Sequence, residues 1–599
     1  MLYRHVDLFP VNFPSNAKLS RLLSVSLLTL IKTLSRIDNL KTLMNIQTRL
    51  KRIYGNDSLL FDLNTLLNNF AKKPSSTSGI TEQDAILITY GNMITQAGEL
   101  PLVTLHTFLK ETLQSIFNSV HILPFYPYTS DDGFSVVDYY AVNADLGDWG
   151  HIKALSKDFN LMFDAVFNHI STKSNWFQAF LRDEEPYIDY FTVVDPESDL
   201  SEVVRPRALP LLTPFETLSG TKYVWTTFSA DQVDLNYTSP DLLLDVIRVL
   251  LFYVEQGAKL IRLDAIAFIW KEIGTSCIHL ENTHLLIQLM RDVLDRIAPD
   301  VILITETNVP HQENISYFGD GTNEAQMVYN FALPPLAYHT MLTGDTTKLS
   351  KWASQLERVG DKTTYFNFTA SHDGIGLRPV ADILSQEEIK QLVQTTEKHG
   401  GLVSYRSMSD GTQSPYELNI TYFDAITAPE ITLESPELAV KRFMVSQAIA
   451  MSLIGVPGIY FHSVFGSRNN HAGVEKTKHN RTINREKLQY TDLKSLLADE
   501  ASIPSQVYRV YTQLLEIRTN EPAFHPFGEQ KILNLTSDVF AVERISPDKE
   551  HKVLALHNVT DHQVILNLTG NWHDLVGKNT LDTIVLEPFQ IRWLKVQFV

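Results

Sequence analysis

The sequence predicts an α/β protein built on a (β/α)8 TIM barrel, and two observations lead to this prediction. Short apolar runs recur between residues 85 and 462, and longer amphipathic segments separate them. Continuous apolar strands that alternate with helices are typical of a parallel sheet buried on both faces. There are eight such units, the number that closes this kind of barrel. The runs are AILITY (85–90), VHILPF (120–125), LMFDAVF (161–167), AKLIRLDAI (258–266), VILITE (301–306), MVYNF (327–331), TYFNFT (364–369) and GIYFH (458–462).

Three further regions flank or interrupt the predicted barrel. Apolar residues at three- and four-residue spacing predict an N-terminal helical extension, which a Lys/Pro/Ser-rich linker at 72–79 ends. A stretch rich in proline, aromatics and acids predicts an inserted subdomain after strand three, and alternating apolar residues near the end predict a C-terminal antiparallel β domain. The expected boundaries are 1–84 for the extension, 85–169 and 241–520 for the barrel, 170–240 for the insertion and 521–599 for the β domain.

Composition narrows the class of function. The 599 residues are 44% hydrophobic and 20% charged, as in ordinary globular proteins, with a formal net charge of −18. The acidity argues against a nucleic-acid partner, which would favour a basic face. Cys277 is the single cysteine, so no intrachain disulfide can form, and a cytoplasmic location fits. No apolar run approaches the ~20 residues of a membrane span, so we expect no membrane partner. The sequence leaves the assembly open, a homodimer included.

Polar residues end four of the predicted strands, where the active site of such a barrel lies. They are Asp164, Asn168 and His169 after strand three, Arg262 and Asp264 on strand four, Glu306 on strand five, and His372 and Asp373 after strand seven. A single acid after a strand more often caps a helix, but four strands that end this way indicate a site. Convergent carboxylates favour glycoside chemistry, which needs one acid to protonate the leaving oxygen and one carboxylate to meet the sugar carbon.

Other chemistries lack their sequence signals. The sequence has no cysteine–histidine cluster of metal-ligand spacing, and it has neither a phosphate-binding loop nor a dinucleotide-binding loop. We therefore expect no metal site and no cofactor.

Four segments resemble the signature segments of the α-amylase superfamily, glycoside hydrolase family 13. They are DAVFNH (164–169), IRLDAIAF (261–268), ITETN (304–308) and ASHDGIG (370–376). LPFYPYTSDDGFSVVDYYAVNADLGDW (123–149), KEIGTSC (271–277), NFALPPL (330–336) and NRTINR (480–485) further resemble the sucrose phosphorylase subfamily.

This resemblance implies the catalytic roles. Asp264 would be the nucleophile that forms a glucosyl ester, Glu306 the general acid and base, and Asp373 the residue that stabilises the transition state. The charge of Arg262 would keep Asp264 ionised, and the surroundings of Glu306 should raise its pKa. The glucosyl unit would be held by Asp131, Phe134, His169, Phe228, Arg262, His372 and Arg481.

The resemblance also implies an acceptor site in which Arg207 contacts phosphate and Tyr416 assists it. Sucrose phosphorylases carry histidine, glutamine and tyrosine where this sequence has Asn308, Glu417 and Phe268. All three positions fall on the fructose side, so the donor should stay glucose while the acceptor should not be plain fructose. Glu417 would then need a neutralising cation, for which Arg406, Lys271 or Arg207 are candidates.

The segment VSYRSMSDGTQSPYELN (403–419) and the N-terminal extension resemble the glucosylglycerate phosphorylase branch. The predicted enzyme is therefore a retaining glycoside phosphorylase acting on 2-O-α-glucosylglycerate and phosphate. Alternatives are a sucrose, sucrose 6-phosphate or glucosylglycerol phosphorylase, an α-glucosidase-type hydrolase, and a non-catalytic sugar-binding protein. A hydrolase would need neither Arg207 nor Tyr416, and a binding protein would usually lack a catalytic acid.

Overall fold

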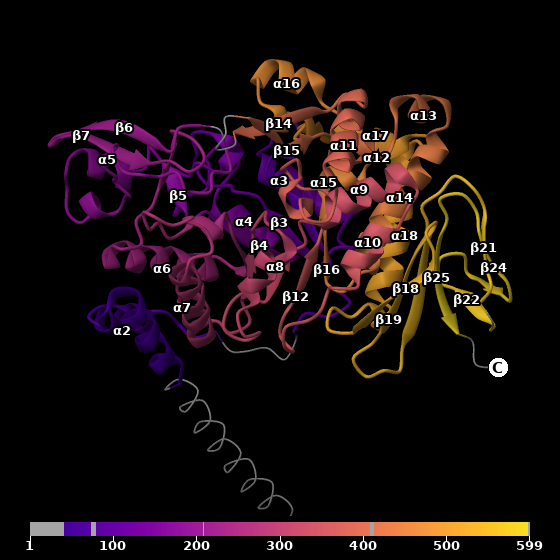
Figure 1. Cartoon of the computed structure of the whole chain (residues 1–599), viewed down its shortest axis with the longest axis horizontal. Coiled ribbons are helices and arrows are strands. Elements are labelled where there is room, and N and C mark those ends of the chain that lie inside the picture. The colour runs from indigo at the N-terminus through magenta and orange to yellow at the C-terminus, as the bar shows by residue number, and fades with distance from the viewer. Residues whose placement is uncertain (1–40, 74–78, 208, 408–411, 569, 597–599) are drawn as a thin grey trace, which may run out of the picture.

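The computed structural model describes residues 41–73, 79–207, 209–407, 412–568 and 570–596 (Figure 1). The first 40 residues of the predicted helical extension and residues 74–78 of the predicted linker lie outside this range. Among the described helices, none combines the length and the apolar character that crossing a membrane requires.

Eight parallel strands form a closed barrel at the centre of the protein, as predicted. Their order around the barrel is β1-β16-β12-β11-β10-β9-β4-β3. Each strand ends within three residues of the last residue of the corresponding predicted apolar run. The strands stop earlier than the runs because the last apolar residues of each run already belong to the loops above the barrel. The strands are β1 (Ile86–Thr89), β3 (Ser119–Ile122), β4 (Asn160–Ala165), β9 (Ala258–Leu263), β10 (Ile302–Thr305), β11 (Met327–Tyr329), β12 (Thr364–Asn367) and β16 (Val456–Tyr460).

Helices cover the outside of the barrel, and capping residues set where they begin. The hydroxyl of Ser239 accepts a hydrogen bond from the first turn of α6 (Pro240–Glu255), and proline at the first position has no N–H to leave unpaired. Ser385 and Glu388 form a reciprocal capping box at the start of α11 (Gln386–Lys398). The other helices of the barrel region are α3 (Pro101–Thr112), α4 (Trp149–Leu155), α7 (Glu281–Ile297), α8 (His311–Ile315), α9 (Leu333–Thr343), α10 (Thr347–Ala353), α12 (Tyr422–Ile426), α13 (Pro429–Glu434), α14 (Pro436–Ser452), α15 (Phe461–Val464), α16 (His471–Thr477), α17 (Tyr490–Ala498) and α18 (Ile503–Thr519).

The chain leaves the barrel after β4 and forms the inserted segment. It contains α5 (Asn175–Leu181) and the antiparallel hairpin of β6 (Leu212–Thr217) and β7 (Gly220–Trp225). Trp225 is buried in a small apolar cluster separate from the main core. At the base of the insertion β5 (His169–Ser171) pairs with β8 (Gln232–Asp234), which places both strands beside the barrel mouth.

The described part of the N-terminal extension packs directly on the barrel. Residues 41–54 are helical and α2 (Leu60–Asn68) follows. Leu50 and Leu63 are buried in the same core as the barrel strands. Arg49 Nε lies 2.5 Å from Asp292 Oδ2 on α7, and the Tyr54 hydroxyl donates to the carbonyl of Tyr237 at 3.0 Å.

The C-terminal region is an antiparallel β domain, as predicted, at the opposite end of the long axis from α2 (Figure 1). The last alternating apolar stretch of this domain, TIVLEPFQIRWLKV (583–596), predicts one strand but divides into β24 (Ile584–Leu586) and β25 (Ile591–Val596), which belong to different sheets. The break contains Pro588, which cannot donate to a ladder, and Phe589, whose φ is 51°. The remaining strands are β18 (Glu529–Thr536), β19 (Val539–Ile545), β20 (Lys552–Asn558), β21 (Val564–Leu566), β22 (Trp572–Asp574) and β23 (Asn579–Leu581).

Two antiparallel strands, here called the acceptor hairpin, lie in the segment 403–419, which carries the predicted acceptor residues Tyr416 and Glu417; residues 408–411 lie outside the described residues. β14 (Leu402–Ser407) and β15 (Gln413–Asn419) pair antiparallel, with a bulge between Ser404 and Tyr405. β15 also pairs with β13 (Ile375–Gly376), so the hairpin is tied to the segment that follows Asp373. This pairing fixes the positions of Tyr416 and Glu417 above the barrel.

Candidate active site

One cavity at the carboxyl ends of the barrel strands brings the predicted residues together. It is lined by Asp131, Phe134, His169, Arg207, Phe228, Asp264, Glu306, Asn308, His372, Asp373, Tyr416, Glu417 and Arg481. Three of the residues predicted at the strand ends do not line it, because their side chains are buried: Arg262, Asp164 and Asn168.

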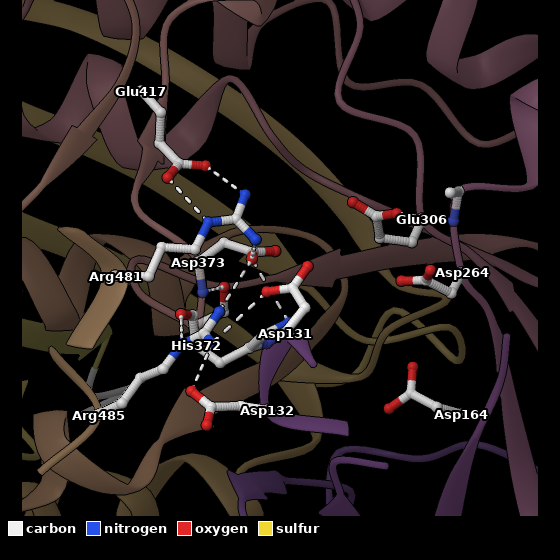
Figure 2. A network of polar contacts seen from close by, with 12 residues as sticks. Asp131, Asp132, Asp164, Asp264, Glu306, His372, Asp373, Glu417, Arg481 and Arg485 are labelled. Carbon is white, nitrogen blue, oxygen red and sulfur yellow. Dashed lines mark hydrogen bonds and ion pairs between the residues drawn. The ribbon is translucent and has the colours of Figure 1, made fainter. Parts of the chain in front are cut away.

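Arg262 organises the carboxylates of the floor. Its Nη1 donates to Asp264 Oδ1 at 2.7 Å and also to Asp164, and its Nη2 lies 3.7 Å from Glu306 Oε2. Asp164 is held from the other side by His121 Nε2 at 2.7 Å. The backbone N–H of Ala265 donates to Glu306 Oε2 at 3.0 Å. Figure 2 shows Asp264 and Glu306 next to one another, and both carboxyl groups lie near Arg262. Adjacent strands thus present two carboxyl groups to the same point.

Burial changes the ionisation of this pair. It raises the pKa of Asp264 to about 8, against the opposing effect of Arg262, and it raises the pKa of Glu306 as well. The raised pKa of Glu306 agrees with the expectation. For Asp264, Arg262 lowers the pKa as expected, but the effect of burial is larger. Two close carboxyls of raised pKa retain one proton between them near neutral pH. The shorter contact of Arg262 with Asp264 favours the proton on Glu306.

Asp373 lies in a stronger positive field. Its Oδ1 lies 2.5 Å from Arg481 Nη1, 3.7 Å from Arg485 Nη2 and 3.5 Å from His372 Nε2 (Figure 2). Burial alone would raise the pKa of Asp373, but the positive charges of Arg481 and Arg485 hold it well below its usual range. Asp373 is therefore ionised near neutral pH, as a carboxylate that binds sugar hydroxyls requires.

A strained turn carries Asp131 into the cavity. Asp131, Asp132 and Gly133 have φ angles of 52°, 48° and 116°, three left-handed residues in succession. A Cβ on Gly133 would lie 2.6 Å from the carbonyl oxygen of Pro124, so only glycine fits there. Asp131 Oδ2 accepts from Arg207 at 3.1 Å, and this contact keeps its pKa low despite burial.

The residues after this turn build an apolar and neutral wall. The ring of Phe134 stacks on His372 with centroids 4.7 Å apart and planes 5° from parallel. His169 Nε2 lies 2.9 Å from the carbonyl of Phe134 and 3.2 Å from Gln232 Nε2. Burial lowers the pKa of His169 to about 4 and that of His372 to about 3, so both imidazoles are neutral near pH 7. Neutral rings offer hydrogen bonds to a sugar without adding charge.

The acceptor side contains fewer internal contacts. The guanidinium of Arg207 lies 5.5 Å from the ring centroid of Phe228. Burial raises the pKa of Tyr416 to about 12, which keeps its hydroxyl protonated. Asn308 Oδ1 is buried and has no hydrogen-bond partner among the described residues. A Cβ on Gly376 would lie 2.7 Å from the Asn308 amide, so glycine makes room for it.

Glu417 is neutralised by Arg481, which was not among the expected cations. Arg481 Nε and Nη2 donate to the two Glu417 oxygens at 3.0 and 2.7 Å, a bidentate pair. Lys271 Nζ instead lies 2.8 Å from Asp234 Oδ2 on β8, and Arg406 does not line the cavity. Arg481 thus connects a predicted acceptor residue, Glu417, with a predicted catalytic one, Asp373.

Sequence reasoning missed several polar residues of the site, three of which have long side chains. Gln232 and Arg378 line the cavity, and Arg485 lies beneath it, donating to the carbonyl of His372 at 2.7 Å. Arg485 ends the segment NRTINR, which could have indicated it. Gln232 and Arg378 stand in stretches with no comparable signal. One group of described residues could hold a metal ion, Asp548, Glu550 and His551, and it lies in the C-terminal domain, outside the cavity lining.

Comparison with known proteins agrees with this architecture. Residues 109–393 match the α-amylase catalytic domain. The glucosylglycerate phosphorylase of Allomeiothermus silvanus is 51% identical over 522 residues, 86% of this chain and 92% of that protein. The enzyme of the same name from Escherichia coli is 46% identical over 520 residues, again 86% and 92%. The crystal structure of sucrose 6F-phosphate phosphorylase from Thermoanaerobacter thermosaccharolyticum superposes with a TM-score of 0.68 at 23% identity, covering 80% of this chain and 94% of that one, which supports the fold. The chain therefore belongs to the α-amylase family, glycoside hydrolase family 13, within the group that contains the glucosylglycerate phosphorylases.

Proposed function

We propose that this protein is a retaining glycoside phosphorylase that converts 2-O-α-glucosylglycerate and phosphate to α-glucose 1-phosphate and glycerate. The observation that carries the proposal is the match to glucosylglycerate phosphorylases at 46–51% identity over 80–86% of the chain. The cavity supports it, because two neighbouring carboxyl groups of raised pKa, an ionised Asp373 and cationic side chains lie together.

In the first step of the proposed reaction the Asp264 carboxylate attacks the anomeric carbon. The bond from that carbon to the glycerate oxygen breaks, and the proton of Glu306 moves to the leaving oxygen. A β-glucosyl ester and free glycerate result. The positive charge that develops on the sugar is stabilised by the neighbouring carboxylates, while Asp373 binds ring hydroxyls.

In the second step phosphate takes the place of glycerate. Glu306, now a carboxylate, accepts a proton from a phosphate hydroxyl as that oxygen attacks the anomeric carbon, and the ester bond to Asp264 breaks. Two inversions give α-glucose 1-phosphate and return Glu306 to its protonated form. The two substrates and the two carboxyl groups account for every proton and bond, so we propose phosphate as the co-substrate and no cofactor.

Arg207 is the residue that we propose for phosphate, with Tyr416 beside it. Its guanidinium lines the cavity and forms an ion pair with the carboxylate of Asp131. The cellular location and the oligomeric state are predictions from the sequence. The single cysteine predicts a cytoplasmic location, and a homodimer stays an open prediction.

The direct test offers the enzyme α-glucose 1-phosphate with glycerate, glycerol, fructose and fructose 6-phosphate, and measures phosphate release. We expect glycerate to be used with the highest kcat/KM. Equal or better use of fructose would refute the acceptor assignment and leave glucosyl transfer intact. Release of glucose at the same rate with and without any acceptor would indicate a hydrolase.

A further inference from the structure

The cavity contains one arginine whose charge the cavity itself does not balance. Three arginines line it: Arg207, Arg378 and Arg481. Arg481 is paired with Asp373 and Glu417, and Arg207 with Asp131, and these three carboxylates also line the cavity. Among described residues the ion-pair partner of Arg378 is Glu313, at 3.4 Å, and Glu313 does not line the cavity.

The guanidinium of Arg378 is therefore available to a ligand. An arginine has five N–H donors, and the hydrogen bond to Glu313 is the one that Arg378 makes within the described part of the chain. Its side chain is 17% exposed, whereas that of Glu313 is 43% exposed. Glu313 also lies 3.1 Å from His279 Nε2, so it is shared between two partners. Solvent weakens the ion pair between Arg378 and Glu313. The guanidinium of Arg378 therefore keeps its positive charge and most of its N–H donors for a ligand in the cavity.

The surroundings of Arg378 place it on the acceptor side. It stands at the start of the turn that follows β13, two residues after Gly376, the glycine that makes room for Asn308. Arg378 and Tyr416 are close enough to interact electrostatically, and so are Tyr416 and Glu306. Arg378, Tyr416 and Asn308 therefore surround the space into which a leaving group protonated by Glu306 would extend.

These three side chains offer what a hydroxy acid needs. A carboxylate accepts hydrogen bonds only, and Arg378 and the Tyr416 hydroxyl can both donate. A hydroxyl can donate to Asn308 Oδ1, the buried acceptor atom that has no partner among described residues. We propose that Arg378 binds the carboxylate of the acceptor and that Asn308 binds an acceptor hydroxyl. This proposal rests on the proposed function, because it assigns residues to the acceptor of that reaction.

The test uses α-glucosyl fluoride as donor, because fluoride leaves without an anion-binding group and so loads the enzyme independently of Arg378. Glycerate and glycerol then compete for the glucosyl-enzyme, and the ratio of glucosylglycerate to glucosylglycerol is measured. Arg378→Gln should lower the glycerate-to-glycerol ratio by roughly 10²-fold, because a desolvated charge pair is lost on one acceptor only. Arg378→Lys, which keeps the charge but loses the fork, should fall between.

Glu313→Gln is the matched control, since it removes the same ion pair from outside the cavity. If the pair has only a structural role, Glu313→Gln and Arg378→Gln should change the ratio alike, and that result would overturn the proposal. An unchanged ratio in Arg378→Gln would overturn it too. Retention of the ratio in Glu313→Gln together with its loss in Arg378→Gln supports it.

Failure of the proposed function would be visible separately. Wild-type enzyme that consumes the fluoride and uses phosphate but not glycerate would refute the acceptor of the proposed reaction. In that case the phosphate-to-glycerol ratio tests Arg378 on the remaining anion. A loss of that ratio in Arg378→Gln would retain Arg378 as an anion-binding residue, and no loss would reject it.

Discussion

The two sides of the cavity differ in how many ion pairs their charged side chains form within the protein. On the glucose side, Arg262 contacts three carboxylates and Asp373 has three cationic or imidazole neighbours within 3.7 Å. On the acceptor side, Asn308 Oδ1 has no partner among described residues, and Arg378 has one hydrogen bond of 3.4 Å. Charged groups that are already paired before substrate binds fix one sugar geometry. Groups left with spare hydrogen-bonding capacity can accept different ligands in turn, as alternate binding of glycerate and phosphate requires.

The largest expected effect comes from removing either floor carboxyl. Asp264→Ala and Glu306→Ala should each lower kcat by several orders of magnitude, since residues that act as one unit fail together. Azide can enter the space that each truncation leaves, and it separates their roles. With α-glucosyl fluoride, Asp264→Ala plus azide should give β-glucosyl azide, and Glu306→Ala plus azide should give α-glucosyl azide, as measured by NMR. The opposite pair of anomers would exchange the two roles.

Removing the charge of Glu417 should harm the glucose side although Glu417 stands on the acceptor hairpin. Glu417→Gln leaves Arg481 to move toward Asp373 alone, and a broken buried ion pair is costly. We expect kcat/KM to fall about 10²-fold for glycerate and glycerol alike. Arg481→Lys combined with Glu417→Gln should cost much less than the product of the single effects, because both substitutions disrupt one pair. A change confined to glycerate would instead assign Glu417 to the acceptor.

The sequence predicts the glucose side more completely than the acceptor side, and the reason is physical. The glucose-side residues Asp264, Glu306 and Asp373 end or follow strands that can be recognised as short apolar runs in the sequence. Their positions along the chain are therefore enough to place them at the mouth of a barrel. Their neighbour Arg485 is not predicted, although it stands in the recognisable segment NRTINR, because its contact with His372 joins residues 113 positions apart. Chain spacing carries no information about such a contact.

The acceptor side is predicted less completely. Residues 403–419 are mostly polar and lack clear alternation, so nothing in them indicates the pairing of β14 with β15. The partner of Glu417 cannot be found by charge alone, since Arg207, Lys271, Arg406 and Arg481 are equal candidates in the sequence. Only the register of β15 against β13 turns Glu417 toward Arg481.

The pH dependence of the reaction should report the raised pKa of the floor pair. Glu306 must carry a proton to release glycerate, and Asp264 has a pKa of about 8 as a member of the same pair. Above that pH the pair loses its one proton, so kcat/KM for glucosylglycerate should fall about tenfold per pH unit. With α-glucosyl fluoride, which needs no acid, the first step should stay constant there. An alkaline fall with both donors would place the loss elsewhere.

The same pair gives a stability test with a definite sign. An unfolded carboxyl has a pKa of about 4, so the folded state holds the proton more tightly from roughly pH 4 to pH 8. The pair therefore lowers stability increasingly as pH rises through that window. Asp264→Asn should raise Tm relative to wild type more at pH 7 than at pH 4, measured by calorimetry. A Tm difference independent of pH would argue against a raised pKa.

The smallest predicted effect tests whether the unpartnered atom of the acceptor side contributes to binding. Asn308→Ala removes a single hydrogen bond to an acceptor hydroxyl, so transfer to glycerate and to glycerol should both fall about three- to tenfold. Hydrolysis of α-glucosyl fluoride should keep its rate, because the glucose side is untouched. Asn308→Asp keeps the acceptor oxygen but adds a negative charge, which repels a carboxylate and leaves a neutral polyol unaffected. It should therefore lower transfer to glycerate while transfer to glycerol stays near wild type. If the alanine variant discriminates between the two acceptors, or if the aspartate variant does not, Asn308 contacts something other than the hydroxyl that both acceptors share.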